Sequence, residues 1–386
     1  MHIPTIRIKD DFQQPWYDSE VHELNKRKNW LHKRYKTTKS TIHYLKFAEC
    51  RKQVQKLADS KLDEYFADEN SPNLIKKKFY SYVKSKTNSH RIPEVVNYND
   101  CLRSKPKDQA DLFNKYFSDQ FSAPSHYNID ISYTNNESYS IDFNPSRIEA
   151  LLRDVNPNKA QGPDKIHGKI LKNCARSLSR PLAILFNLSY NTGCIPSDWK
   201  LANIVPIHKK GSKAEVSNYR PISLTSLVMK IYEKIIRDKL MTKCGHLIDD
   251  RQHGFLKFKS CTTQMVYYCD SLALSLNDNI RSDAIYFDFQ KAFDCVNHDI
   301  ILKKLKYKYN IDGYLLRFFV NYLKDRYQRV VINGEQSGLL KVNSGVPQGS
   351  ILGPTLLILF LNDISEGLTE GRIFVFMPMT LNYGVA

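Results

Sequence analysis

The chain of 386 residues, 42% of them hydrophobic, is long enough to bury a substantial core and longer than one typical domain. Its 57 Lys and Arg against 40 Asp and Glu give a net charge of +17, so a polyanion is the first partner to consider, nucleic acid before an anionic membrane. No apolar run approaches the roughly 20 residues of a spanning helix, and the N-terminus lacks a secretory signal, so we expect an intracellular protein without a membrane anchor.

The eight cysteines are scattered, with no close pair at zinc-ligand spacing. This pattern indicates reduced, mostly buried thiols and argues against a disulfide framework or a zinc knuckle. Most of the eleven histidines are equally isolated, so neither residue type predicts a metal centre.

Residues 1–122 are predicted to form a basic, mostly helical region. From Ser19 to about Lys86 the chain is nearly free of Gly and Pro, and aromatic residues and leucines recur near the helical period. Such helices can track a phosphate backbone, but a solvated face opposite an apolar stripe explains the same pattern and is the commoner case. A further amphipathic helix is predicted at Asp108 to Phe121, and residues 123–144 are predicted to be a linker at a domain boundary.

The next block contains a predicted hairpin with a lysine-rich tip. The strand Asn203 to His208 runs into three lysines and a glycine between Lys209 and Lys213. Lysines in that position can reach a triphosphate, although a solvated loop is more frequent in general. Pro221 favours an extended conformation at Arg220, so that its guanidinium can be aimed at a target.

The stretch from Ala284 to His298 carries the candidate catalytic residue. Apolar and polar residues alternate in its first half, so a strand would bury one face and hold Asp288 on the other. Lys291, Phe293 and Asp294 follow, a combination suited to a site where metal ions, phosphates and a sugar meet. The alternative is an ordinary strand on which Asp288 caps a turn or accepts a hydrogen bond.

A glycine-rich turn, Gly345 to Pro354, lies between a predicted hairpin, whose turn contains Asn333-Gly334, and a predicted helix. Glycines let the backbone approach a ligand closely, and the Gln348 amide offers both a donor and an acceptor. A buried turn without a ligand is the alternative interpretation.

Four segments, in this order, resemble the reverse transcriptases of non-LTR (LINE-type) retrotransposons, closest to the jockey-like group: Asn158–Asp164, Asn218–Leu224, Phe287–His298 and Gly345–Pro354. The resemblance runs from about residue 145 to 376, and the basic region before it resembles the connector between endonuclease and polymerase in such elements. It implies an α+β fold over residues 145–380, the fingers and partial palm of a right-hand polymerase, with a ferredoxin-like sheet and packed helices. The thumb is expected to be absent.

The resemblance implies roles for three residues of the opening stretch. Asp288, together with the backbone carbonyl of Phe289, would ligate two Mg²⁺ ions that bridge the primer hydroxyl and the incoming triphosphate. Phe293 would be the steric gate, a flat ring that clashes with a ribose 2′-hydroxyl and so favours deoxynucleotides.

The resemblance also implies a nucleotide-binding set. Arg220, with Lys209 or Lys210, would clamp the triphosphate and offset its charge. Gln348 and Gly349 would pack against the incoming nucleotide and the template. The implied partners are an RNA template, a DNA primer and deoxynucleoside triphosphates, with no membrane, and the implied location is cytoplasm and nucleus.

One segment departs from the family pattern. The family carries a Phe/Tyr-Ala-Asp-Asp box whose aspartates supply the remaining metal ligands. Here Arg372 to Phe376 reads as the strand before that box, and Met-Pro-Met-Thr, residues 377–380, stands in its place with no carboxylate between Gly371 and Ala386. We expect the chain to be inactive as written, because losing a ligand pair from a two-metal site costs many orders of magnitude in rate.

Two other functions stay open at this point. One is a non-enzymatic protein, a basic remnant that binds RNA without catalysis. A group II intron or retron polymerase shares the palm motifs, but the jockey-like connector and the lack of a maturase-like extension argue against it.

The genetic code yields a test of the missing box. Met-Pro-Met-Thr is encoded by ATG-CCN-ATG-ACN, and reading from the third base gives GCC-NAT-GAC, which is Ala-Asp-Asp when N is G. We therefore predict that a frameshift after Phe376 hides an intact box, that residues 381–386 are out of frame, and that genomic DNA carries CCG at Pro378. Any other codon at Pro378 refutes the frameshift.

Overall fold

The computed structural model describes residues 16–67, 80, 92–122, 140–280, 289–364 and 366. Its contacts divide the chain into two units, Met1–Arg91 and Ile92–Ala386, and each is described by itself. Asp288, the segment from 367 to the C-terminus and most of the predicted linker lie outside the described residues.

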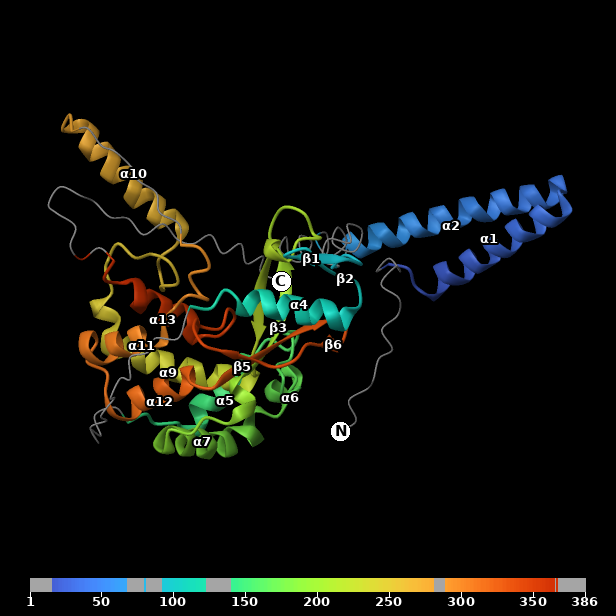
Figure 1. The fold of residues 1–386 in the computed structure, drawn as a ribbon. Helices are drawn as coiled ribbons and strands as arrows, with labels where there is room; N and C mark the ends of the chain where they lie inside the picture. Colours follow the sequence, from blue (N-terminus) through green and yellow to red (C-terminus); the bar gives the residue numbers. More distant parts are fainter. Residues whose placement is uncertain are drawn as a thin grey trace. The chain divides into compact units, whose positions relative to one another are not determined.

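The first unit is a helical hairpin of α1 (Ser19–Thr38) and α2 (Thr41–Ala67), coloured blue in Figure 1. The Asp18 carboxylate accepts from the Val21 backbone N–H at 3.1 Å and so caps the start of α1. Lys39 adopts the left-handed conformation that ends it. Long helices, as predicted here from periodicity, are therefore present as far as Ala67. Of the predicted stretch beyond it, up to about Lys86, only Tyr80 lies within the described residues.

The second unit mixes helices and strands, as expected of an α+β fold. Its first half contains β1 (Val96–Tyr98), β2 (Cys101–Arg103), α4 (Pro106–Ser118), α5 (Pro145–Arg153), α6 (Gly168–Asn173), α7 (Ala175–Thr192), α8 (Ser197–Lys200), β3 (Leu201–His208), η2 (Val216–Asn218), β4 (Tyr219–Leu224) and α9 (Leu227–Cys244). Its second half contains η3 (Gly245–Leu247), α10 (Cys261–Asn277), α11 (His298–Lys303), η4 (Lys304–Lys308), α12 (Gly313–Leu323), β5 (Arg326–Ile332), β6 (Glu335–Gln336), β7 (Leu340–Val342) and α13 (Leu352–Leu361).

The main sheet has the strand order β4-β3-β5-β6, with β7 also paired to β5. β3 and β4 form the predicted antiparallel hairpin, in which Ile207 lies opposite Arg220. β3 runs parallel to β5, and a second hairpin turns at Asn333 and Gly334, which both have positive φ as this dipeptide favours in a two-residue turn.

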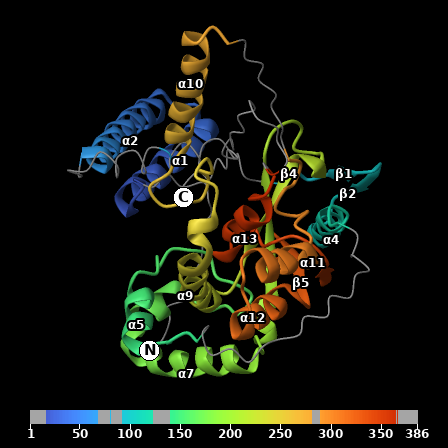
Figure 2. The same cartoon turned by 90° about the vertical axis from the view of Figure 1, so that its left-hand side faces the viewer.

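The largest core lies among the helices of the second unit. Figure 2 shows α9 between the green helices α5 and α7 and the orange helices α11 and α12. Tyr232 on α9 stacks on Phe186 with centroids 4.7 Å apart and meets Phe318 edge-on at 5.3 Å. These fully buried rings tie α7, α9 and α12 together.

A second core lies between α4 and the sheet (Figure 1). Phe113 on α4 is fully buried and meets the Tyr219 ring of β4 edge-on at 4.9 Å. The sequence interpretation grouped α4 with the basic helical region, and the structure instead divides the chain at Arg91 and packs α4 on the sheet. The physical reason is that the apolar face of α4 has its complement on β3, β4 and β5, a long-range match that helical periodicity does not reveal.

Two further findings concern composition. No helix in the described part of the chain is long and apolar enough to cross a membrane. All eight cysteines are free, but only Cys50 and Cys244 are buried and four are exposed, so the expectation of mostly buried thiols was wrong.

Phe113 tests the assignment of α4 to the sheet. We expect Phe113→Ala in the full chain to lower the free energy of unfolding of the second unit by ~3–5 kcal/mol, through lost burial and the cavity left behind. Lys115→Ala, at an exposed site on the same helix, should change it by less than ~0.5 kcal/mol. Urea unfolding measures both, and equal effects would show that α4 is not packed as described.

Candidate functional site

The lysine-rich segment forms the tip of the β3–β4 hairpin. Its base is closed by the Lys209 backbone N–H, which donates to the Asn218 carbonyl at 2.8 Å, and the Asn218 side chain donates across the tip to the Ser212 carbonyl at 2.9 Å. Lys209 and Lys210 are exposed, and Arg220 is half-buried on β4. Alternation along the paired strands puts Lys209 and Arg220 on the same face of the hairpin.

The glycine-rich turn is fastened on one side to the segment that follows Asp288. The backbone N–H of Gly345 donates to the Val296 carbonyl, and that of Val346 to the Phe293 carbonyl, both at 2.8 Å. Gly345 has a φ of +83°, and a Cβ there would lie 2.7 Å from the Phe293 carbonyl oxygen. Only glycine therefore fits at this position.

The same turn is fastened on its other side to β4. The Ser223 backbone N–H donates to the Gln348 carbonyl at 2.7 Å. Gly349 has a φ of +125°, and a Cβ there would lie 2.6 Å from the Ser223 carbonyl oxygen. The turn Gly345–Gly349 is thus held between the backbones of two other segments, and Gln348 and Gly349 come close to the strand that carries Arg220.

The turn containing Gly162 packs just after β4. A Cβ on Gly162 would lie 2.7 Å from the backbone of Thr225 and Ser226, so these two segments of the chain are in direct contact. Ser226 in turn caps α9 by accepting from the Met229 N–H at 3.2 Å. Three of the four segments picked out in the sequence therefore meet through backbone contacts, and the segment that contains Gly162 contacts the residues that directly follow Asn218–Leu224.

Asp294 and Gln348 are joined side chain to side chain. The Gln348 amide nitrogen donates to both carboxylate oxygens of Asp294 at 3.2 Å. Burial raises the pKa of Asp294 to about 6, while the Gln348 hydrogen bond and the Lys291 charge oppose the rise. Because an ionised carboxylate can only accept, the amide nitrogen of Gln348 must face it and the amide oxygen points elsewhere.

Two further side chains hydrogen-bond to the backbone of the turn Gly345–Gly349 and of the residues just after it. His298 Nε2 lies 2.7 Å from the Gly345 carbonyl, and burial lowers the pKa of this histidine. Glu233 on α9 is fully buried and accepts from the Ile351 N–H at 2.6 Å and from the Tyr322 hydroxyl at 2.9 Å. Burial raises the pKa of Glu233.

The aromatic residues near Asp288 differ in exposure. Phe289 is 42% exposed, whereas Phe293 is 5% exposed and packs edge-on against Phe255 at 6.0 Å. Little of the Phe293 ring is therefore accessible from solvent. Asp288 lies outside the described residues, and among those that are described no three His, Cys, Asp or Glu side chains are grouped so as to hold a metal ion.

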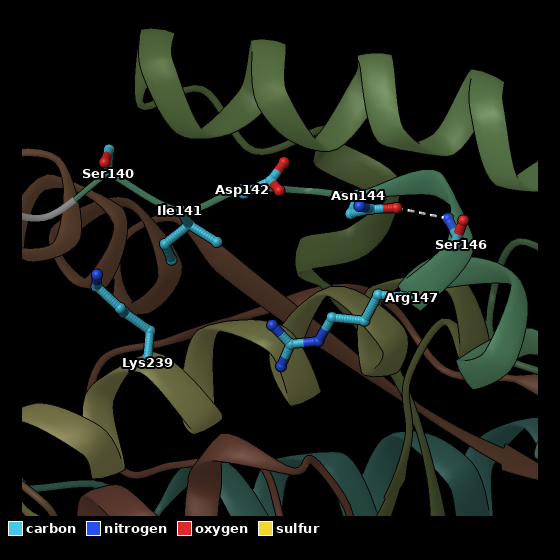
Figure 3. Close-up of a pocket in the computed structure, with 7 residues that line it drawn as sticks. All are labelled: Ser140, Ile141, Asp142, Asn144, Ser146, Arg147 and Lys239. Atoms are coloured by element: carbon cyan, nitrogen blue, oxygen red, sulfur yellow. Dashed lines mark hydrogen bonds between the residues drawn. The ribbon is translucent and has the colours of Figure 1, made fainter.

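Two pockets differ in size and composition. A cavity of about 30 Å³ between the sheet and the turn is lined by Ser223, Asp294 and Gln348 among others, and holds space for a water molecule rather than a nucleotide. A pocket of about 470 Å³ lies between the start of α5 and α9 (Figure 3). Arg147, which lines it, is paired with Asp238 at 2.9 Å, and none of the predicted site residues lines it.

Comparison with known proteins identifies the domain. Residues 207–377 match the family model for reverse transcriptase (RNA-dependent DNA polymerase). The chain is 31% identical over 232 residues to the probable RNA-directed DNA polymerase from transposon BS of Drosophila melanogaster, covering 58% of this chain and 25% of that protein. It is 32% identical over 222 residues to the RNA-directed DNA polymerase from mobile element jockey of the same fly, covering 56% and 24%. Residues 207–377 thus carry a reverse transcriptase domain, and the relatives that the chain resembles are named as polymerases of mobile elements.

The chain spans about a quarter of the length of these curated relatives. The matched region begins at the end of β3 and includes the hairpin tip, β4 and the turn Gly345–Gly349. The backbone contacts that fasten this turn thus lie inside the reverse transcriptase domain.

Sequence reasoning missed how the turn is held. It named Asp294 as suited to the site without its bond to Gln348, and it did not single out Ser223, Glu233 or His298. The one available signal for Glu233 was an acid flanked by the apolar pairs Ile231–Tyr232 and Ile235–Ile236. Ser223 acts through its backbone N–H, and the His298 ring contacts a backbone carbonyl, contacts that the residue types do not predict.

Two glycines test how closely the turn of the reverse transcriptase domain is fastened. Gly345 and Gly334 share a positive φ, but a Cβ on Gly334 would meet nothing within 4 Å. We expect Gly334→Ala to cost ~1–2 kcal/mol from backbone strain alone and Gly345→Ala ~1–3 kcal/mol more, because the Phe293 backbone cannot move aside. Equal losses in urea unfolding would contradict the close contact.

Asp294 predicts a pH dependence of stability. The pKa of Asp294 in the folded chain, about 6, lies above its ordinary value of 3.8. The protonated carboxyl group therefore contributes its full stabilisation of the fold below pH 3.8, and this stabilisation is lost as the pH rises through 6. Asp294→Asn cannot ionise, so its stability relative to the natural chain should rise by ~1–3 kcal/mol between pH 4 and pH 7. Asp108→Asn, at an exposed site, is the control, and a parallel profile for both variants would refute the burial of Asp294.

Proposed function

We propose that the chain is the polymerase portion of a non-LTR retrotransposon RNA-directed DNA polymerase, with fingers and a partial palm that bind an RNA template and a DNA primer. The observation that carries the proposal is the meeting of three family segments at the turn Gly345–Gly349, and of the fourth with the residues just after β4, through contacts that leave no room for a Cβ at Gly162, Gly345 or Gly349. Contacts of this kind fix the relative positions of segments that are far apart in the sequence. The proposed reaction, RNA-directed DNA synthesis, is taken from the names of the relatives.

In this proposal β3 and β4 are the fingers hairpin. Lys209 or Lys210 and Arg220 contact the triphosphate, and their fixed charges offset the negative charge of the nucleotide. Their accessible positions at and near the hairpin tip support this role. Phe293 would meet the sugar as a steric gate through the small part of its ring that stays accessible.

Gln348 is proposed to read the incoming nucleotide through its amide oxygen. Because its amide nitrogen is held by Asp294 at 3.2 Å, the oxygen is left to accept from a ligand hydroxyl. Gly349, in close contact with Ser223, sets the distance between this amide and β4.

Magnesium enters the proposal through Asp288 and the carbonyl of Phe289. A carboxylate and a carbonyl oxygen are ligands that Mg²⁺ accepts, and the ions would stabilise charge on the attacking and leaving oxygens. The residues present do not complete a two-ion centre, because residues 371–386 contain no carboxylate. We therefore propose that the chain as written binds its substrates without catalysing their joining.

The proposal is tested by primer extension on an RNA template. We expect no Mg²⁺-dependent extension by the natural chain, and salt-sensitive binding of the primer–template. The triple variant Met377→Ala, Pro378→Asp, Met379→Asp rebuilds the box after Phe376 and should raise extension by at least about 100-fold, since it restores the missing ligands.

The control is the same triple variant with Asp288→Ala, which should return extension to background. Extension by the natural chain would contradict the proposed inactivity. Equal extension with and without Asp288 would contradict its role as a metal ligand, and failure to bind primer–template would contradict the proposed function itself.

A further inference from the structure

The helical hairpin of the first unit has a strongly polarised charge. Residues 26–56, which we call the basic arm, comprise the last part of α1, the turn and the first part of α2, and hold eleven Lys and Arg against a single acid, Glu49. The other end of the hairpin, residues 16–25 and 57–67, holds six acidic residues and a single cation, Lys61. Like charges on neighbouring turns of a helix repel each other. A helix whose charges serve only to keep its outer face solvated would therefore mix the two signs and not separate them.

The two ends also differ in how their charges are compensated. Lys61 lies 3.0 Å from the Asp18 carboxylate and 3.7 Å from that of Glu20. Within the described residues no salt bridge is found for the eleven cations of the basic arm, and all of them except Lys28 are exposed. The arm therefore presents a concentrated positive charge to solvent.

Aromatic residues are exposed within the same arm. Trp30 is 56% exposed and Tyr44 is 48% exposed, whereas Trp16 at the opposite end is 7% exposed. The Arg34 guanidinium lies over the Trp30 ring at 5.1 Å, and Tyr44 packs against Tyr35 at 5.3 Å. Flat faces flanked by guanidinium and ammonium groups are suited to stacking on unpaired bases.

The apolar stripe that holds the hairpin together does not account for these rings. The side chains buried between the helices include Val21, Leu31, Cys50 and Val54. Trp30 and Tyr44 lie outside this set and leave about half of their surface in solvent. The commoner explanation of a basic helix is a solvated face opposite a buried stripe. It accounts for the buried stripe, but it explains neither the exposed rings nor the separation of charge.

We propose that the basic arm is a binding site for single-stranded RNA, in which cations contact phosphates while Trp30 and Tyr44 stack on bases. Phosphates complement the charge, and unpaired bases complement the rings, a combination that neither a membrane surface nor an acidic peptide offers. The choice of RNA over DNA rests on the proposed function, whose template is RNA. The arm would add a second contact on the template, outside the reverse transcriptase domain.

Tryptophan fluorescence of the full chain tests the stacking. The chain has three tryptophans, and Trp16 and Trp199 are 7% and 6% exposed, so Trp30 is the ring that solvent and ligand reach. We expect saturable quenching on titration with a short oligouridine. Trp30→Phe should remove the quenching and keep the affinity, followed by fluorescence anisotropy, within about threefold, because a Phe ring can still stack.

Charge variants test the phosphate contacts. The triple variant Lys33→Gln, Arg34→Gln, Lys36→Gln should weaken oligouridine binding about tenfold or more near 0.1 M salt and flatten the slope of log K against log salt by about 2, since single strands contribute about 0.7 per phosphate contact. The control carries the same charge change on exposed residues of α6 and α7, Lys169→Gln, Lys172→Gln, Arg176→Gln. It should bind within about twofold of the natural chain.

Three outcomes would overturn the proposal. They are the absence of Trp30 quenching, equal losses in the arm and control variants, and equal or tighter binding of oligothymidine. Neither readout requires catalysis or the primer–template contacts of the second unit. If the basic arm does not bind oligouridine, the proposed polymerase function is therefore unaffected. If primer–template binding fails while oligouridine still quenches Trp30, only the proposed polymerase function is contradicted.

Discussion

The reverse transcriptase domain depends on one close backbone contact, the seating of the turn Gly345–Gly349 between Phe293 and Ser223. Cβ atoms at the two glycines would lie 2.6–2.7 Å from carbonyl oxygens of the flanking segments, and hydrogen bonds of 2.7–2.8 Å join the same backbones. Backbone cannot rotate away as a side chain can, so this contact fixes the spacing between β4 and the segment after Asp288. The position of Gln348 relative to Arg220 follows from that spacing.

The helical core holds the turn in place through a buried polar network. Glu233 accepts from the backbone of Ile351 and from Tyr322, whose ring lies 4.8 Å from the fully buried guanidinium of Arg326. A buried carboxyl group is costly unless its hydrogen bonds are made, so the start of α13 is constrained to the one position that satisfies Glu233. The aromatic stack on α9 supplies the apolar burial that offsets part of this cost.

Local patterns in the sequence predicted the elements, and long-range contacts account for what was missed. The β3–β4 hairpin and the Asn333–Gly334 turn are encoded by alternation and turn chemistry within a few residues, and both are present. The placement of α4 on the sheet and the Asp294–Gln348 bond join residues tens to more than a hundred positions apart, which no local period can reveal. Asp288, the residue with the clearest predicted role, lies outside the described residues, so its role stays a prediction.

Hydrogen exchange of the full chain, with and without an RNA–DNA primer–template, tests most directly whether the assembled segments form the polymerase surface. We expect slower exchange on binding in peptides covering the hairpin tip, Lys209 to Asn218, and the turn Gly345–Ser350, and unchanged exchange around the pocket between α5 and α9. Protection confined to that pocket, or binding that leaves the hairpin tip and the turn unprotected, would contradict this expectation.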